Sequence, residues 1–176
     1  MNEMVTSCID VEIDRLTHSI ENVITGESFP TEVLPIAKTD FPQITKKNGW
    51  KFNWKLEFGL SNRKVFKLII IDNPEVIHGL ISFSIEMGFI EMHLIESAPH
   101  NFGKNKMYYG VPTNLTAFAC KCSFEHGFDG YVAFTAKTAL IEHYRRILGT
   151  VLIGGQRMML ETPQARNLVN MYYSNK

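Results

Sequence analysis

The sequence contains little cysteine, and its three cysteines, Cys8, Cys120 and Cys122, form no recognisable pairing pattern. An odd number of cysteines without Cys-x-x-Cys spacing differs from both a disulfide framework and a structural zinc site. Cys120 and Cys122 are two residues apart in a segment expected to be helical, so their side chains diverge and act as small hydrophobic groups. We therefore expect no metal site and a reduced, cytoplasmic protein.

Neither sign of charge is in excess, because 18 Lys and Arg residues balance 18 Asp and Glu residues. Without a net positive field, the chain does not concentrate nucleic acid or an anionic membrane around itself. Nucleic acid is therefore not an expected partner, and any phosphate must be held by a local arrangement of donors and charges.

Long hydrophobic runs are also missing. The longest, at residues 68–71 and 77–83, are much shorter than the roughly 20 residues that span a bilayer. Asp10, Glu12 and Asp14 lie early in the chain, with no basic flank leading into an apolar stretch, which differs from a signal peptide. No membrane segment and no secretion are expected.

The size and composition predict one domain over residues 1–176. With 45% hydrophobic and 20% charged residues, the chain is typical of a globular protein large enough to enclose its own core. Residues 1–49 form a divergent N-terminal part, in which Pro30, Pro35 and Pro42 break the chain into short pieces. We expect this part to pack over one end of the core.

Alternating residues predict four successive strands. Between residues 50 and 58, aromatic and apolar residues alternate with polar ones in a period of two, as on a strand with one wet face. Further strands are predicted at residues 65–71, 76–85 and 89–96, with turn residues between them. These strands are expected to be antiparallel neighbours.

Helical spacing dominates the second half of the chain. Apolar residues recur at helical intervals from Leu115 to a stop at Gly127, and again from a cap at Thr138 to a stop at Gly149. Short strands are predicted at 130–135, 151–153 and 158–160, and a last helix at 165–172. The fold class is therefore predicted to be α+β.

A glycine turn at residues 110–115, between a polar loop and a helix, predicts an anion site. A helix that begins there aims unpaired backbone N–H groups, and the positive end of its dipole, at one point. Neither GxxxxGK[ST] nor GxGxxG is present, so this is not a Walker or dinucleotide loop. The alternative is that Gly110 and Pro112 only make a tight turn and start the helix.

The order of these elements resembles the GNAT superfamily of N-acyltransferases. The resemblance rests on the antiparallel strands, the segment ESAP at residues 96–99, the glycine turn, and LIEHY at 140–144 with LG at 148–149. It covers roughly residues 50–160. It implies a three-layer αβα fold with a central mixed, mostly antiparallel sheet, and acetyl-CoA or coenzyme A as the cofactor.

The family's pyrophosphate-binding signature, Q/R-x-x-G-x-G/A, falls on residues 107–112, where only Gly110 matches. Met107 stands in place of Gln or Arg, and Pro112 lacks a backbone donor. Lys104 and Lys106 are point charges that can reach a phosphate. The resemblance assigns cofactor binding to Ile95, Ser97, Tyr109, Gly110, Val111, Thr113, Asn114 and Leu115.

The resemblance also implies catalytic roles for three residues. Tyr144 matches a tyrosine that protonates the departing thiolate, and a phenol with a pKa near roughly 10 can act as that acid. Glu96 ranks first as the general base, and His93 second, because an imidazole pKa near roughly 6.5 suits proton transfer at neutral pH. For each residue, the alternative is an ordinary core or hydrogen-bonded side chain.

Together these features imply an N-acetyltransferase in which an amine attacks an acyl-CoA directly. The backbone at residues 95–97 would polarise the thioester carbonyl. No motif identifies the acceptor, a small-molecule or protein amine, and a homodimer is possible in this superfamily. The alternative is a non-catalytic binding protein of the same fold with weak or lost CoA binding. A further alternative, acylation of charged transfer RNA, is disfavoured by the balanced charge.

Overall fold

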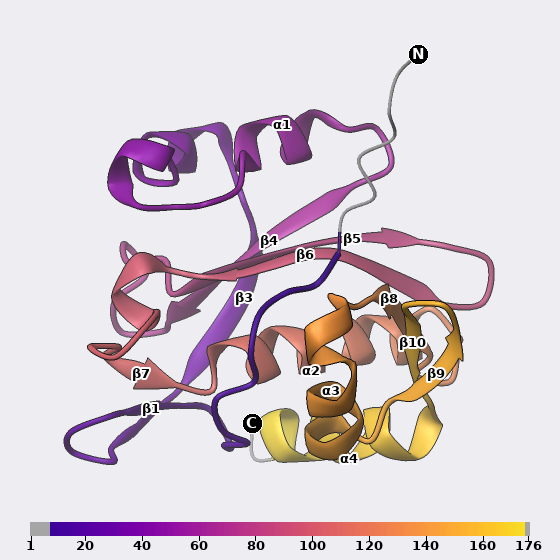
Figure 1. The fold of residues 1–176 in the computed structure, drawn as a ribbon. Helices are drawn as coiled ribbons and strands as arrows, with labels where there is room; N and C mark the ends of the chain where they lie inside the picture. The colour runs from indigo at the N-terminus through magenta and orange to yellow at the C-terminus, as the bar shows by residue number, and fades with distance from the viewer. Residues whose placement is uncertain (1–7, 175–176) are drawn as a thin grey trace.

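The computed structural model describes residues 8–174, and a seven-stranded sheet runs through its centre (Figure 1). In spatial order the strands are β3 (Thr31–Pro35), β4 (Lys64–Ile70), β5 (Gly79–Ile85), β6 (Ile90–Ser97), β8 (Val132–Thr135), β10 (Arg157–Leu160) and β9 (Val151–Gly154). Neighbouring strands are antiparallel except for β6 and β8, which are parallel. A smaller sheet joins β2 (Ser28–Phe29), β1 (Ile20–Asn22) and β7 (Tyr108–Tyr109).

Helices cover both faces of the large sheet, as Figure 1 shows. One face carries α1 (Trp54–Gly59) and the 3-10 turns η1 (Lys38–Gln43) and η2 (Lys46–Asn48). The other carries α2 (Val111–Glu125), α3 (Ile141–Leu148) and α4 (Thr162–Tyr173). Two further 3-10 turns are η3 (Pro99–Asn101) and η4 (Thr138–Leu140). The predicted αβα layering and α+β class are confirmed.

Alternation along the strands separates two hydrophobic cores. In β4, Phe66 and Leu68 belong to the larger core beneath α2, whereas Val65 belongs to the core beneath α1. Lys67 faces the α1 side as well, and its ammonium group lies 2.8 Å from a carboxylate oxygen of Asp40. Successive residues of a strand point to opposite faces, so one alternating sequence supplies both cores.

A β-bulge at His93 changes which residues of β6 face each core. The register pairs Phe83 with Met92 and Ser82 with Leu94, which leaves His93 without a partner in the ladder. Met92 packs in the α2 core, but Leu94 packs in the α1 core. A bulge adds one residue to one strand, and a one-residue shift exchanges the two faces.

The strand expected at residues 50–58 is wrong, because part of this segment forms helix α1. The Asn53 side chain accepts a hydrogen bond from the Leu56 N–H and caps the helix, as Asn commonly does. Trp54, in the first turn, is fully buried in the smaller core. The alternating aromatic residues therefore cover the sheet instead of extending it.

The outer strand beside β4 is β3, within the N-terminal part that was given no element. Pro35 ends this strand, and an edge strand tolerates proline because one side needs no ladder donor. The later elements match the prediction in type and order, although α2 begins earlier, at Val111. The predicted cap at Thr138 is wrong, because Thr138 begins the 3-10 turn η4 and α3 starts only at Ile141. Gly149 ends α3 with a left-handed φ of 69°. Within residues 8–174, no helix is both long and apolar enough to cross a membrane.

Candidate functional site

The candidate site is a cavity of about 630 Å³ beside the point where β6 and β8 stop pairing. The parallel ladder covers only Ile90 to Met92 on β6, yet β6 continues to Ser97. Ile95, Glu96 and Ser97 line the cavity from β6, and Lys137 lines it from just beyond β8. The site is therefore built on backbone at the end of a central strand.

Charged side chains of both signs surround the cavity. The basic ones come from loops around its mouth, and they are Lys51, Lys104, Lys106 and Lys137. The acidic ones are Asp10, Glu12, Asp14 and Glu96. The ammonium group of Lys51 lies 3.6 Å from the centre of the Phe102 ring, which also lines the cavity. An arrangement of this kind suits a ligand that carries several charges.

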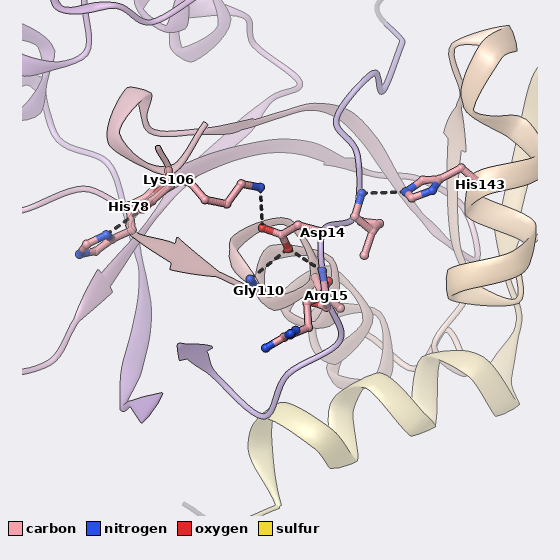
Figure 2. A network of polar contacts seen from close by, with 9 residues as sticks. Asp14, Arg15, His78, Lys106, Gly110 and His143 are labelled. Carbon is pink, nitrogen blue, oxygen red and sulfur yellow. Dashed lines mark hydrogen bonds and ion pairs between the residues drawn. The ribbon is translucent and has the colours of Figure 1, made fainter. Parts of the chain in front are cut away.

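The glycine turn holds a carboxylate in the structure. Figure 2 shows Asp14 between Lys106 and Gly110: the Gly110 N–H donates to one carboxylate oxygen at 3.1 Å, and the Lys106 ammonium group lies 3.0 Å from the other. Gly110 has a φ of 90°, in the left-handed region that favours glycine. The predicted anion site is thus occupied by a carboxylate of the same chain.

A segment at residues 9–15, which we call the N-terminal strap, brings this carboxylate to the turn. Ile9 forms a parallel bridge with Ala136, directly after β8. Its N–H donates to the Thr135 carbonyl and its carbonyl accepts from the Lys137 N–H. Because β10 pairs with the other side of β8, the strap takes the edge that β6 has left.

Tyr144 is buried, with 1% of its surface exposed, and is not among the residues that line the cavity. Its hydroxyl donates to the Val11 carbonyl of the strap. Burial raises the pKa of this phenol well above its ordinary value, and the nearby Asp10 carboxylate raises it further. The neighbouring His143 accepts a hydrogen bond from the Ile13 N–H at 2.8 Å. Both residues therefore contact the strap directly.

Glu96 lines the cavity and is held by three hydrogen bonds. Its carboxylate accepts from the Lys51 N–H at 2.6 Å, the Phe52 N–H at 3.2 Å and the Trp54 Nε1–H at 2.8 Å. It thereby fixes the loop before α1 against the end of β6. A proton acceptor at this position would share its oxygens with these donors.

His93 lies at the bulge and is not among the residues that line the cavity. Its Nε2 lies 2.7 Å from the Ser84 hydroxyl. Burial, together with the Arg63 and Arg157 charges, lowers the pKa of His93 to about 4, despite the opposing effect of Glu86. At neutral pH this imidazole is uncharged and weakly basic.

The other predicted cofactor residues divide into two groups. Ile95 and Ser97 line the cavity, together with Pro112. The remainder of the group lies in or beside the buried start of α2: Tyr109, Val111, Thr113, Asn114 and Leu115. The structure therefore brings Ile95, Glu96 and Ser97 together at the cavity, but not Tyr144 and His93.

No role was predicted for the strap from the sequence. Its signal was the alternation of Asp10, Glu12 and Asp14 with Val11 and Ile13, which has the period of an extended segment with one polar side. Lys51 and Phe52 were also missed, because they were assigned to a strand.

Solved structures with a similar fold include spermidine/spermine N-acetyltransferase SpeG from Vibrio cholerae in complex with manganese ions. It has a TM-score of 0.51 at 15% identity, over 80% of this chain and 97% of that chain. Mutant forms of SpeG match at a TM-score of 0.53, 15% identity, and 78% and 96% coverage. The dodecameric spermidine N-acetyltransferase from Vibrio cholerae in an intermediate state has a TM-score of 0.50 at 15% identity, over 79% of this chain and 98% of that chain.

These enzymes have the GNAT fold, so the predicted fold is confirmed. At this identity the likeness shows the fold alone. No protein-family model matches the chain, and no curated protein matches it in sequence.

Proposed function

We propose that this protein is an acyl-CoA-dependent N-acyltransferase, which transfers an acetyl or other acyl group to an amine. One observation carries the proposal: the backbone of Ile95 to Ser97 borders a cavity where β6 has lost its parallel neighbour. Unpaired strand backbone offers hydrogen-bond donors and acceptors to an extended ligand. The GNAT fold of the chain is consistent with this chemistry.

The lysines support the choice of an anionic acyl donor. Lys51, Lys104, Lys106 and Lys137 line the cavity, and of the four carboxylates that balance them only Glu96 lies outside residues 10–14. Displacement of residues 10–14 would therefore leave the lining with an excess of positive charge. The Gly110 N–H, which donates to Asp14 in this structure, and the start of α2, where Pro112 lines the cavity, are the proposed contacts for a pyrophosphate. The donor's phosphates would lie there and its thioester beside β6.

The chemistry requires little covalent participation by the protein. Backbone donors near Ile95 to Ser97 would stabilise the developing charge on the thioester oxygen. The acceptor nitrogen forms a bond to the acyl carbon, the carbon–sulfur bond breaks, and the proton lost by the amine is balanced by one gained at sulfur. Glu96 is favoured over His93 as the proton acceptor, because Glu96 lines the cavity. Tyr144 is the candidate proton donor to sulfur.

The first test is binding. Acetyl-CoA at millimolar concentration should raise the melting temperature, by an amount set by the ratio of ligand concentration to dissociation constant. Isothermal titration calorimetry should give one site per chain. If no acyl-CoA shifts the melting temperature or produces heat, the proposal is wrong.

The second test is turnover, followed as free thiol released from acetyl-CoA in the presence of an amine. The panel includes spermidine and spermine, which appear in the names of the similar enzymes, with amino acids and peptides. Glu96→Gln should lower kcat more than KM if Glu96 accepts the proton, and the melting temperature of the variant checks its fold. Tyr144→Phe provides the same comparison for the proposed acid.

A non-catalytic protein of the same fold is the second candidate. It is favoured by Met107 and Pro112 in the binding signature, and by the carboxylate that already lies on Gly110. Binding of coenzyme A without thiol release over the whole panel, unchanged by Tyr144→Phe, would favour this candidate.

A further inference from the structure

We propose that the N-terminal strap, residues 9–15, is an internal occupant of the acyl donor site, which must leave the Gly110 turn before an acyl-CoA binds there. The proposal rests on the proposed function, because it takes the donor site to be the cavity and the turn together. Three independent sets of contacts support it: one with strand backbone, one with charged groups and one with helix α3.

The backbone contacts place the strap where a ligand would meet β8. Ile9 continues the parallel ladder beyond the point where β6 leaves it, through one hydrogen bond to Thr135 and one from Lys137. In Figure 1 the strap runs from beside the sheet, past α2, towards β1. An extended chain in this place competes for space with any extended ligand between the two strands.

The charged contacts place carboxylates where phosphates would bind. Asp14 accepts from the Gly110 N–H and pairs with Lys106 (Figure 2). The Asp10 carboxylate lies 3.8 Å from the Lys137 ammonium group. A phosphate oxygen would seek the same N–H and the same lysines. Asp14 and the anionic end of the ligand therefore exclude each other.

The contacts with α3 hold the candidate acid. The Tyr144 hydroxyl donates to Val11, and His143 accepts from the Ile13 N–H, so one turn of α3 is bound to the strap. A hydroxyl that donates to a backbone carbonyl has no proton to offer to a sulfur at the same time. Release of the strap would free the Gly110 turn and the Tyr144 hydroxyl together.

Buried side chains explain why the strap stays closed without a ligand. Ile9 and Ile13 are 2% and 5% exposed and belong to the larger core. Opening exposes this apolar surface, so the open form is a minor population and lowers the apparent affinity for the donor in proportion. The donor therefore binds only at a concentration sufficient to displace the strap.

The test compares acetyl-CoA binding by whole-chain variants. Asp14→Asn removes the charge held at Gly110, and the control Asp72→Asn removes the same charge from an exposed turn. A cysteine pair, Ile9→Cys with Ala136→Cys in a Cys8→Ser background, joins the strap to β8 when oxidised and frees it when reduced, because the two positions are paired. Circular dichroism and melting curves check that each variant folds.

We expect Asp14→Asn to lower the dissociation constant of acetyl-CoA by up to about fivefold, since an ion pair of this kind contributes up to ~1 kcal/mol. Asp72→Asn should leave the dissociation constant unchanged. The oxidised cysteine pair should bind at least about tenfold more weakly than its reduced form. In wild-type protein saturated with acetyl-CoA, the amides of Ile9 and Ile13 should exchange faster with deuterated solvent.

Two different results would contradict the strap proposal and the donor site separately. Equal affinity of the oxidised and reduced forms, with the Ile13 amide still protected at saturation, would overturn the strap proposal and leave the proposed function standing. Absence of acetyl-CoA binding in every form, including Asp14→Asn and the reduced pair, would instead overturn the donor site itself.

Discussion

At the scale of single residues, Glu96 joins the site to the rest of the protein. Its carboxylate accepts hydrogen bonds from two backbone N–H groups and the Trp54 indole, and it lines the cavity as well. The geometry of the cavity wall at Lys51 and Phe52 therefore depends on a side chain from β6. This dependence can be measured as stability, separately from any activity.

Glu96→Gln should lower the free energy of unfolding by about 1–3 kcal/mol. The amide keeps the size of the side chain but replaces one accepting oxygen with a donor, which leaves a backbone N–H at Lys51 or Phe52 unpaired. Urea denaturation measures the difference. The control is Glu142→Gln on the exposed side of α3, which should change stability by less than ~0.5 kcal/mol. Equal effects of the two changes would contradict this account.

Gly110→Ala should destabilise the protein more than Gly88→Ala. Both glycines have a left-handed φ, of 90° and 89°, so the backbone strain of about 1–3 kcal/mol is shared. A Cβ at Gly110 would lie 2.1 Å from the Thr17 hydroxyl oxygen, whereas one at Gly88 meets nothing within 4 Å. Melting curves of the two variants therefore isolate the contact with the chain after the strap. Equal losses would show that Thr17 and the Ser19 carbonyl, which lies 2.8 Å from the same Cβ position, move aside without cost.

At the scale of single residues, the sequence predicted where a residue lies better than which group it contacts. Gly110 was assigned to an anion, and a carboxylate lies there, but the motif gave no indication that the anion was Asp14. Tyr144 was placed on the apolar face of its helix, and the structure buries it, while its role in catalysis stays a prediction. Hydrogen-bond partners distant in sequence leave no local pattern from which to infer them.

At the scale of elements, helix α1 depends on its cap. It spans only Trp54–Gly59, too short to be stable without packing and capping. We expect Asn53→Ala to cost about 1 kcal/mol of unfolding free energy, because the Leu56 N–H loses its acceptor. Chemical denaturation with Lys55→Ala, an exposed position of the same helix, as the control measures this cost. A loss no larger than that of Lys55→Ala would exclude a capping role.

Apolar spacing, together with the turn residues between the apolar segments, located most of the regular elements correctly. Strands β4, β5 and β6 and helices α2, α3 and α4 all lie where apolar spacing predicted them. It failed at residues 50–58, because Trp50 and Trp54 reach the same core from a loop and from a helix. The spacing of apolar residues cannot distinguish one residue in a loop and one in a helix from two residues on the same face of a strand.

At the scale of the whole molecule, buried histidines should make stability depend on pH. Burial, with a smaller effect of His100, lowers the pKa of His78 to about 4, and its Nε2 has no hydrogen-bond partner within residues 8–174. The unfolded chain binds a proton near roughly pH 6.5, where the folded protein does not. Stability should therefore be full above about pH 6.5 and fall as the pH decreases towards 4.

His78→Asn tests this dependence, since the variant should lose less stability than the wild type between pH 7 and pH 4.5. The difference is on the order of 3 kcal/mol at most, from a shift between about 6.5 and about 4. Melting temperatures across the pH range measure it, with the exposed His18→Asn as the control. Parallel curves for wild type and His78→Asn would mean that other groups cause the acid sensitivity.

The overall architecture followed from the order of elements, but the course of the first residues did not. The strap reaches β8 at Ala136 and α3 at Tyr144, far along the chain, and such pairing depends on tertiary structure alone. The cavity is shaped by this pairing as much as by β6. The location of the cavity was predictable from the resemblance, whereas the strap residues that line it were not.

The bulge at His93 affects how this chain is to be aligned with others. Because His93 is one residue too many for the ladder, every position from Leu94 to Ser97 faces opposite to where a continuous count along β6 would put it. If an alignment gap is placed on the wrong side of His93, the residues that border the cavity are matched with residues that point to the opposite face of the sheet. Homologous residues at this site should therefore be matched by facing and not by sequence offset.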